Sequence, residues 1–214
     1  MIRSLPLFPL PGVVLLPGTL LPLHIFEDRY RALVADVLRG DRTIGMAMWK
    51  PGLDAVVENP AIYEVGGAGE IVDSEELEDG RYNILLQASF RFRVLEEEAP
   101  ARPYRIARVE EVRSLPFSDP AEQNRALSGA LALFTELARP LELPPLPTES
   151  ISAERLASEI ALRLRYTPQE LQAILETDAL PARFRALTER MFEWKARVNF
   201  LAPFRPTDLD ARKN

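Results

Sequence analysis

The first part of the chain is apolar but broken by prolines. Between Arg3 and Glu27 there is no acidic residue, lysine or arginine, and prolines stand at positions 6, 9, 11, 17 and 22. Each proline inside a helix would cost about 3 kcal/mol, so this stretch is not expected to cross a membrane as a helix. Proline followed by glycine predicts tight turns at Pro11-Gly12 and Pro17-Gly18. The apolar pieces around these turns predict buried strands at residues 5–10, 13–16 and 19–25.

A helix and a run of strands are expected next. Residues 27–39 have helical periodicity, and Gly40 follows as the expected residue that ends the helix in the left-handed conformation. Alternating and apolar runs then predict five strands, with Asp79-Gly80 as a hairpin turn. The expected strands are residues 43–49, 62–73, 82–88, 90–96 and 104–112. The first half of the chain is therefore predicted to be a closed or half-closed β-barrel with one helix.

The second half is dominated by patterns that begin helices. Asp119 precedes Pro120 and Glu122, Ser152 opens another apolar stripe, and Thr167-Pro168-Gln169-Glu170 is a capping box. The proline-rich residues 139–150 predict a semi-rigid linker. The expected helices start at residues 120, 152, 168 and 182, and end near 138, 164, 176 and 201.

These patterns together predict an α+β protein. A β-barrel subdomain is expected at residues 1–115, an α-helical bundle at residues 116–204 and a flexible tail at residues 205–214.

The composition narrows the functional classes. The chain has 214 residues, of which 47% are hydrophobic and 27% charged, and its net charge is −6. These values are typical of a globular protein, and they give no basic surface for nucleic acid. The absence of cysteine excludes disulfides, thiolate metal sites and cysteine nucleophiles. With no expected membrane span and no convincing leader peptide, the predicted location is the cytoplasm.

Catalytic and metal chemistry finds little support in the residues. His24 is the single histidine, so it cannot form a multi-histidine zinc site, and a hydrogen-bonded structural role is expected. The acids of residues 75–80 match no calcium loop and are expected to face solvent. The segment FRFRV places Phe90 and Phe92 on one side of a strand and Arg91 and Arg93 on the other. A core-facing aromatic pair with a solvated or salt-bridged arginine face is therefore expected, rather than an RNA-stacking surface.

Two groups of residues are candidates for peptide contact. Met46 and Met48 share one face of the strand at residues 43–49, while Trp49 takes the other face. Whichever set is exposed is a candidate contact surface, because methionine adapts to varied partners. Glu27 and Arg29 stand at the start of the first helix. An acid there complements the helix dipole, and the alternative is that the pair holds a peptide terminus.

Four blocks lie in a familiar order along the chain. They are PLPGVVLLPGTLLPLHIFEDRY near the start, IYEVGGAGEIV, EDGRYNILLQASFRFRVLEE and LQAILETDALPARFRALTERM. Together they resemble the Lon substrate-binding domain, the N-terminal region of Lon-type ATP-dependent proteases, over residues 4–195. The stretch PLHIFEDRY at residues 22–30 is the most specific. One departure is Ala88, where the family usually has a glycine in a turn.

The resemblance implies a fold and a function. The family's fold is a β-barrel of the PUA-like class followed by a helical bundle, and the domain recognises polypeptides. The chain has no phosphate-binding loop of the form G-x-x-x-x-G-K-[ST] and no segment resembling the Ser–Lys protease block. The resemblance therefore implies recognition without ATPase or protease domains.

The leading hypothesis is a non-catalytic protein- or peptide-binding module, which is not an enzyme and needs no cofactor or metal. Its expected partners are unfolded or partly unfolded polypeptides, or a protein partner, and neither a membrane nor nucleic acid. Two modes stay open: strand addition at an exposed barrel edge, and an apolar surface between barrel and bundle. The alternative is an RNA-binding PUA-like protein, which predicts strongly salt-dependent binding. A hydrolase ranks last. The oligomeric state and the relation to a protease stay open.

Overall fold

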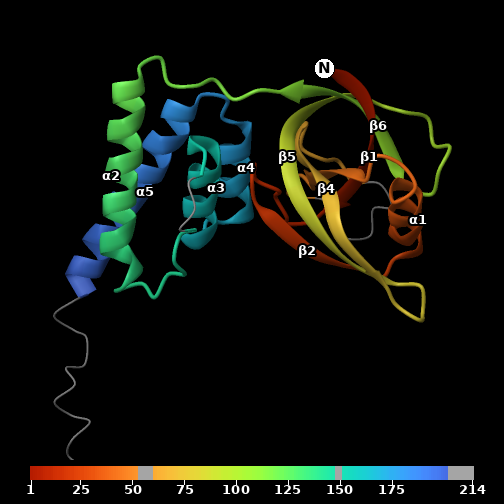
Figure 1. The fold of residues 1–214 in the computed structure, drawn as a ribbon, viewed down its shortest axis with the longest axis horizontal. Helices are drawn as coiled ribbons and strands as arrows, with labels where there is room; N and C mark the ends of the chain where they lie inside the picture. The colour runs from red at the N-terminus through yellow and green to blue at the C-terminus, as the bar shows by residue number, and fades with distance from the viewer. Residues whose placement is uncertain (53–59, 148–150, 202–214) are drawn as a thin grey trace, which may run out of the picture.

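The structure is a computed structural model that describes residues 1–52, 60–147 and 151–201. Figure 1 shows the strands gathered on one side of the molecule and helices α2 to α5 on the other, with α1 lying against the strands. The strands are β1 (Ile2–Leu10), β2 (Leu20–Ile25), β3 (Thr43–Met48), β4 (Val65–Glu76), β5 (Tyr82–Glu97) and β6 (Arg105–Val112). The helices are α1 (Asp28–Val37), α2 (Pro120–Ala138), α3 (Ala153–Arg163), α4 (Pro168–Glu176) and α5 (Leu180–Leu201). The predicted α+β class is confirmed.

One mixed sheet contains all of these strands, in the order β2-β5-β4-β3-β1-β6. The long strand β5 also pairs with β6, so the pairs β5-β4-β3-β1-β6 close on themselves. The first part of β5 pairs with β2 and its last part with β6. Only β1 and β3 run parallel; the other pairs are antiparallel. Strand β2 is therefore a free edge of the sheet. The PUA-like class stays a prediction.

Several of the predicted strand boundaries are wrong. Strand β1 begins at Ile2 rather than at residue 5, and β4 ends at Glu76 rather than at residue 73. The strands expected at residues 82–88 and 90–96 are one continuous strand. Ala88 pairs with Gly69 and Phe90 with Ala68, so the intervening Ser89 forms a β-bulge rather than a turn. Strand β4 begins at Val65 rather than at residue 62. Ile62 forms only an isolated bridge with Trp49, just beyond the end of β3.

Residues 13–16 were expected to form a strand, and they do not. The two flanking turns are confirmed, with positive φ at Gly12 and Gly18. Between them the side chains still alternate, because Leu15 packs into the core under the sheet and Leu16 into the core between the helices. Because no strand pairs with it, this segment forms no ladder of hydrogen bonds. Its side chains instead pack alternately into the two cores.

The helix α1 ends differently from the prediction. Gly40 was expected in the left-handed conformation, but Arg42 takes the positive φ of 59° instead. The backbone N–H of Arg42 returns to the carbonyl of Val37 at 3.0 Å, and its Nε donates to the carbonyl of Ile71 at 2.8 Å. The side-chain hydrogen bond to β4 helps to hold a conformation that a residue with a Cβ rarely adopts.

The caps predicted for the later helices are confirmed. Asp119 accepts from the backbone N–H groups of Ala121 and Glu122, and Ser152 accepts from that of Arg155. Thr167 and Glu170 form the complete reciprocal capping box at the start of α4. Residues 139–147 are not helical, as the linker prediction requires. The side chain of Leu201 and the predicted tail at residues 205–214 lie outside the described residues.

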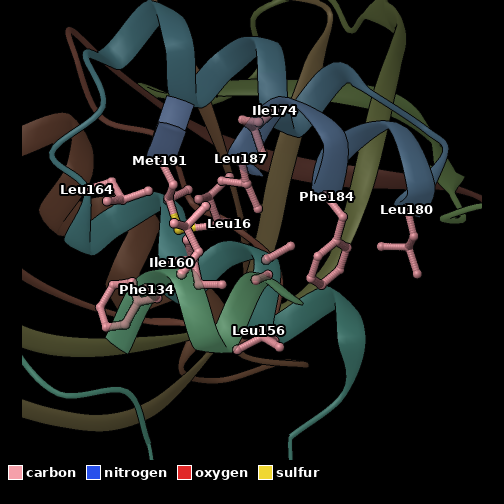
Figure 2. Close-up of a cluster of buried hydrophobic side chains, with 14 of the residues drawn as sticks. Leu16, Phe134, Leu156, Ile160, Leu164, Ile174, Leu180, Phe184, Leu187 and Met191 are labelled. Atoms are coloured by element: carbon pink, nitrogen blue, oxygen red, sulfur yellow. The ribbon is translucent and has the colours of Figure 1, made fainter. Parts of the chain in front are cut away.

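Helices α2 to α5 share one apolar core, which Figure 2 shows from close by. Phe134, Ile160, Leu187 and Met191 are each at most a few per cent exposed. Leu16 from the start of the chain enters the same core. No helix within the described ranges is long and apolar enough to cross a membrane.

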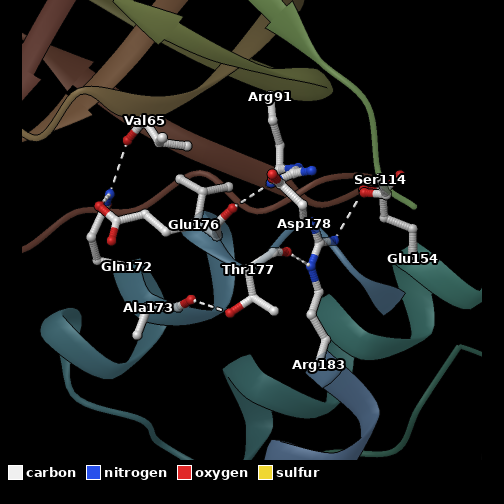
Figure 3. A network of polar contacts seen from close by, with 11 residues as sticks. Val65, Arg91, Ser114, Glu154, Gln172, Ala173, Glu176, Thr177, Asp178 and Arg183 are labelled. Atoms are coloured by element: carbon white, nitrogen blue, oxygen red, sulfur yellow. Dashed lines mark hydrogen bonds and ion pairs between the residues drawn. The ribbon is translucent and has the colours of Figure 1, made fainter. Parts of the chain in front are cut away.

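Buried polar groups join the sheet to the helices, as Figure 3 shows. Arg91 of β5 is 1% exposed, and its Nη1 donates to the Leu175 carbonyl at 2.8 Å and to Asp178 Oδ1 at 3.0 Å. The expectation that Arg91 lies on a solvated face is therefore wrong, although its ion pair fits the salt-bridged alternative. The outer face of β5 is covered by helices at this point. Gln172 of α4 adds a hydrogen bond from its Nε2 to the carbonyl of Val65, at 2.9 Å.

A second buried guanidinium lies beside the first. Arg183 of α5 donates from Nε to the Thr177 carbonyl at 2.6 Å and from Nη1 to Glu154 at 3.1 Å. Glu154 also accepts from Ser114, in the segment that leads from β6 to α2. At these positions the space between sheet and helices is filled by packed side chains and ion pairs. Beside them lies a hollow of about 410 Å³, which is lined mainly by polar and charged side chains: Lys50, Tyr63, Glu64, Arg93 and Glu176, with Val65. The described residues around these ion pairs therefore do not form the open apolar surface that was the second expected binding mode.

Candidate functional site: a cleft beside helix α1

A cleft of about 550 Å³ opens where α1 begins, between the end of β1 and the segment joining β5 to β6. Its volume falls within the range of small-ligand and peptide pockets. The lining residues are Pro9, Arg29, Tyr30, Pro60, Ala61 and residues 97–106.

The wall formed by α1 is held by aromatic and ionic contacts. Tyr30 is buried, its ring lies 4.2 Å from that of Phe8, and its hydroxyl donates to the carbonyl of Pro9 at 3.3 Å. Arg29 lies over the Tyr30 ring at 4.5 Å and pairs with Glu27 at 2.8 Å. Burial is the largest influence on the Tyr30 phenol, and it raises the pKa of that group. Tyr30 therefore stays neutral near pH 7 and acts as a fixed apolar wall with one internal hydrogen bond.

The opposite wall is tied to the end of α1 by a single carboxylate. Asp36 accepts from the hydroxyl of Tyr104 at 2.8 Å and from Nη1 of Arg102 at 2.9 Å. It also pairs with Arg39, two residues beyond the end of α1. The hydrogen bond from Tyr104, followed by those from the two arginines, holds the pKa of Asp36 below its ordinary value. Asp36 thus anchors Arg102 and Tyr104, on one wall of the cleft, to α1.

Arg105 closes the base of the cleft. Its Nη1 donates to the carbonyl of Pro60 at 2.8 Å, and its Nε donates to Glu97 at 2.7 Å. Arg102, Arg105 and Arg29 each have an acidic partner, so the cleft carries no large excess of one charge. Its rim is rich in proline and alanine, which expose backbone carbonyls without bulky side chains. Such a cleft suits an extended polypeptide segment, recognised mainly through its backbone.

The residues predicted from the sequence to contact a peptide differ in how accessible they are. Met46 and Met48 are each 2% exposed, so their prediction as a contact surface is wrong. Strand β3 is buried on both faces, which the alternation of its side chains could not reveal. Trp49 is half-buried and packs against the apolar core that contains Phe92. Arg29 lines the cleft, and Glu27 positions it from one side. Whether Glu27, Arg29 or Trp49 touches a peptide stays a prediction.

Comparison with known proteins identifies the family. Residues 4–192 match the family described as the ATP-dependent protease La (LON) substrate-binding domain. The chain belongs to this family. The Lon protease 2 of Myxococcus xanthus is 30% identical over 192 residues, which are 87% of this chain and 23% of that protein. The Lon protease of Dictyoglomus thermophilum is 31% identical over 194 residues, 86% of this chain and 24% of that protein. The chain thus spans about a quarter of these relatives.

Solved structures agree with the Lon-domain assignment. A Lon N-terminal domain protein from Xanthomonas campestris is 27% identical, with a TM-score of 0.62 over 86% of this chain and 96% of that one. The N-terminal domain of a Lon protease from the Mycobacterium avium complex is 17% identical, with a TM-score of 0.63 over 88% of this chain and 98% of that one, which shows a shared fold. The family match covers the substrate-binding domain and not the ATPase or protease domains.

The histidine of this Lon domain lies in residues 22–30, the stretch on which the sequence resemblance most depended. His24 is exposed on β2, where its Nδ1 lies 2.7 Å from Oδ1 of Asn83 and its Nε2 lies 3.1 Å from Nη1 of Arg81. Because the Arg81 guanidinium can only donate, Nε2 accepts and Nδ1–H donates to Asn83. The expected hydrogen bonds of His24 are confirmed, and its purely structural role stays a prediction. The acids of the neighbouring hairpin form no metal-binding cluster within the described part of the chain.

The cleft wall of this Lon domain should loosen when Asp36 loses its charge. In an Asp36→Asn variant at pH 7, the backbone amide of Glu98, which donates to the carbonyl of Ile106, is expected to exchange hydrogen faster than in the wild type, because the charge-assisted bonds from Arg102 and Arg39 are weakened. The folded-state pKa of Asp36 is lowered, so the carboxylate's contribution is present above its ordinary pKa and is lost as the pH falls through the lower folded value. The difference between variant and wild type should therefore shrink in acid. Equal exchange at pH 7 would contradict this role.

Proposed function

We propose that this chain is a non-catalytic recognition domain that binds unfolded or partly unfolded polypeptides through the cleft beside α1. The single observation that carries the proposal is the match of residues 4–192 to the Lon substrate-binding domain family. The cleft supplies a location of suitable size, with walls held in place by Tyr30 and Asp36. The predicted cytoplasmic location agrees with partners of this kind.

The same proposal extends to the architecture. We infer a PUA-like barrel at residues 1–115 and a helical bundle at residues 116–204. The closed cycle of strand pairs supports the barrel, and the core shared by α2 to α5 supports the bundle. In this arrangement the barrel provides the binding cleft, and the bundle braces one face of the sheet through Arg91 and its partners.

Filling the cleft tests its role. Ala101 lies on the exposed cleft wall, and an Ala101→Trp variant would occupy the space without disturbing a buried contact. We expect the wild type to bind a reduced, permanently unfolded protein and not its folded form, and Ala101→Trp to weaken this binding about tenfold or more. Affinity is measured by fluorescence anisotropy of the labelled unfolded protein.

The matched control places the same side chain elsewhere. Ala132 is exposed on α2, far from the cleft in the sequence, and Ala132→Trp should bind like the wild type. If neither the folded nor the unfolded protein binds, the proposed function is wrong. If Ala101→Trp binds as tightly as the wild type, the cleft is not the site, and the free edge of β2 becomes the location to test.

RNA binding has no specific support in this geometry. Phe92 is fully buried, Arg91 is covered by helices, and Arg93 lies 3.9 Å from Glu64. The FRFRV segment therefore offers no stacking platform of aromatic rings and arginines on one face.

A further inference from the structure

A further hollow is lined by residues of the segment before α2, the first half of α2 and residues 181–192 of α5. Figure 1 shows the two helices side by side. The hollow has a volume of about 290 Å³, and its floor is formed by the rings of Phe117 and Phe184, 5.8 Å apart. Ala126 of α2 and Pro181 of α5 form apolar sides. The hollow is thus an apolar groove, separate from the cleft beside α1.

An exposed aromatic side chain stands on the rim of the same groove. Phe192 of α5 is 58% exposed, although it is among the largest apolar side chains of the helix. A phenylalanine left in water forgoes about 1.5–3 kcal/mol of burial free energy. A protruding ring and a hollow lined by aromatic rings therefore lie on one face, about two helical turns apart between Phe184 and Phe192.

The charges of this face are complementary to one another. Arg185 and Glu189 line the groove, both are exposed, and neither forms an ion pair with any described residue. They are spaced four residues apart on α5, with the arginine first, which is the weaker order for a pair within one helix. Their side chains are available to groups outside the molecule.

We propose that this face binds the same face of a second copy of the chain, with the two α5 helices antiparallel across a two-fold axis. If the axis lies at the level of Leu187, Arg185 of each copy is opposite Glu189 of the other, which gives two ion pairs. Phe192 lies five residues further along, about 7.5 Å at the helical rise. It therefore reaches the level of Ala182 in the second copy, above Pro181 and the aromatic floor. Phe192 of each copy thus enters the groove of the other, so the same contact forms twice, as a two-fold interface requires.

The charge pattern favours a second copy over an arbitrary apolar segment. An apolar segment would fill the hollow and leave Arg185 and Glu189 unpaired, whereas the two-fold arrangement pairs these two charges and places both Phe192 rings at once. Glu122 of α2, the third charged residue of the lining, is left without a partner in either arrangement. This interface does not depend on the function proposed for the cleft, because no lining residue is shared between the two.

Charge reversal followed by charge exchange tests the interface. We expect the full chain to dimerise in sedimentation equilibrium at concentrations below about 200 µM. Arg185→Glu and Glu189→Arg should each weaken dimerisation about tenfold or more, because each places like charges opposite one another. The double variant, with both changes, should restore it, and Phe192→Ser should weaken it as strongly as either reversal.

The control removes an exposed apolar side chain from another face. Leu162 of α3 is 39% exposed, and Leu162→Ser should dimerise like the wild type. A wild type that stays monomeric to about 200 µM overturns the proposal. So does a dimer that neither single reversal weakens, or a double variant as weak as the singles. If Phe192→Ser loses affinity for an unfolded protein while the wild type is monomeric, the groove holds polypeptide instead and the dimer is wrong.

Discussion

Replacing Gly67 by alanine is expected to lower the free energy of unfolding by about 3 kcal/mol or more. A Cβ at this position would lie 2.0 Å from the carbonyl oxygen of Leu15 and 3.0 Å from its carbonyl carbon. Both are backbone atoms, so no side-chain rotation can relieve the clash. Gly67 is in β4 and pairs with β3 through Met46 and with β5 through Arg91, which prevents the strand from moving away.

The segment that would have to move is also fixed on both sides. Leu15 and Leu16 are each 1% exposed in two different cores, so a shift of their backbone opens both. This cost far exceeds the gain of about 0.4–1 kcal/mol that alanine gives by restricting the unfolded chain. Urea unfolding followed by circular dichroism measures the change.

Gly129 is the matched control for Gly67. It lies inside α2, and nothing lies within 4 Å of the position that a Cβ would take. Gly129→Ala should therefore stabilise the protein by up to about 1 kcal/mol, through helix propensity alone. If Gly67→Ala is tolerated as well as Gly129→Ala, the close packing of residues 13–16 on β4 is wrong.

The second large effect is expected at Asp178, where Asp178→Asn should cost about 2 kcal/mol. The guanidinium of Arg91 is 1% exposed, and an arginine cannot shed its charge by losing a proton. Removing the carboxylate therefore leaves a buried cation whose remaining full hydrogen-bond acceptor among the described residues is the carbonyl of Leu175. Because Asp178 is itself 44% exposed, the loss should fall below that of a fully buried pair.

A second cation makes the loss worse. The pKa of the Arg183 guanidinium is lowered, mainly by burial and next by the nearby positive charge of Arg91. Without Asp178, Glu154 remains the acidic partner of Arg183, and Arg91 has no ion pair with any other described residue. The control is Glu136→Gln, which breaks an exposed pair with Lys195 on the surface of α2 and α5 and should cost less than about 0.5 kcal/mol. Equal losses in the two variants would contradict the role of Asp178.

The helices of the second half could be predicted closely because their starting signals are local. Asp119, Ser152 and the box of Thr167 and Glu170 each use side chains within three residues of the groups that they cap. The ends of the strands were harder to predict, because a bulge and a turn next to Ala88 would leave the same pattern in the sequence. Alternation assigned Arg91 correctly to the side opposite Phe92, but it could not show that helices cover that side.

The candidate site depended on contacts that no local pattern contains. Met46 and Met48 were misjudged because alternation implies one exposed face only when one face of the sheet meets water, and β3 meets none. The cleft joins Arg29 to residues 97–106, which are separated by about seventy positions and meet only in the fold. The proline-rich run around Pro100 and Pro103 was the one visible sign of an irregular wall there.

The segment at residues 13–16 has a consequence for the growing chain. Val14 and Leu16 are made early, but they pack against helices that include Leu164 and Met191, which leave the ribosome much later. Until then these apolar side chains stay in water, while the odd-numbered side chains beside them can already dock under the sheet. During synthesis the chain therefore passes through an intermediate in which Val14 and Leu16 are exposed. Until α5 has been made, these apolar side chains can promote aggregation or bind a chaperone.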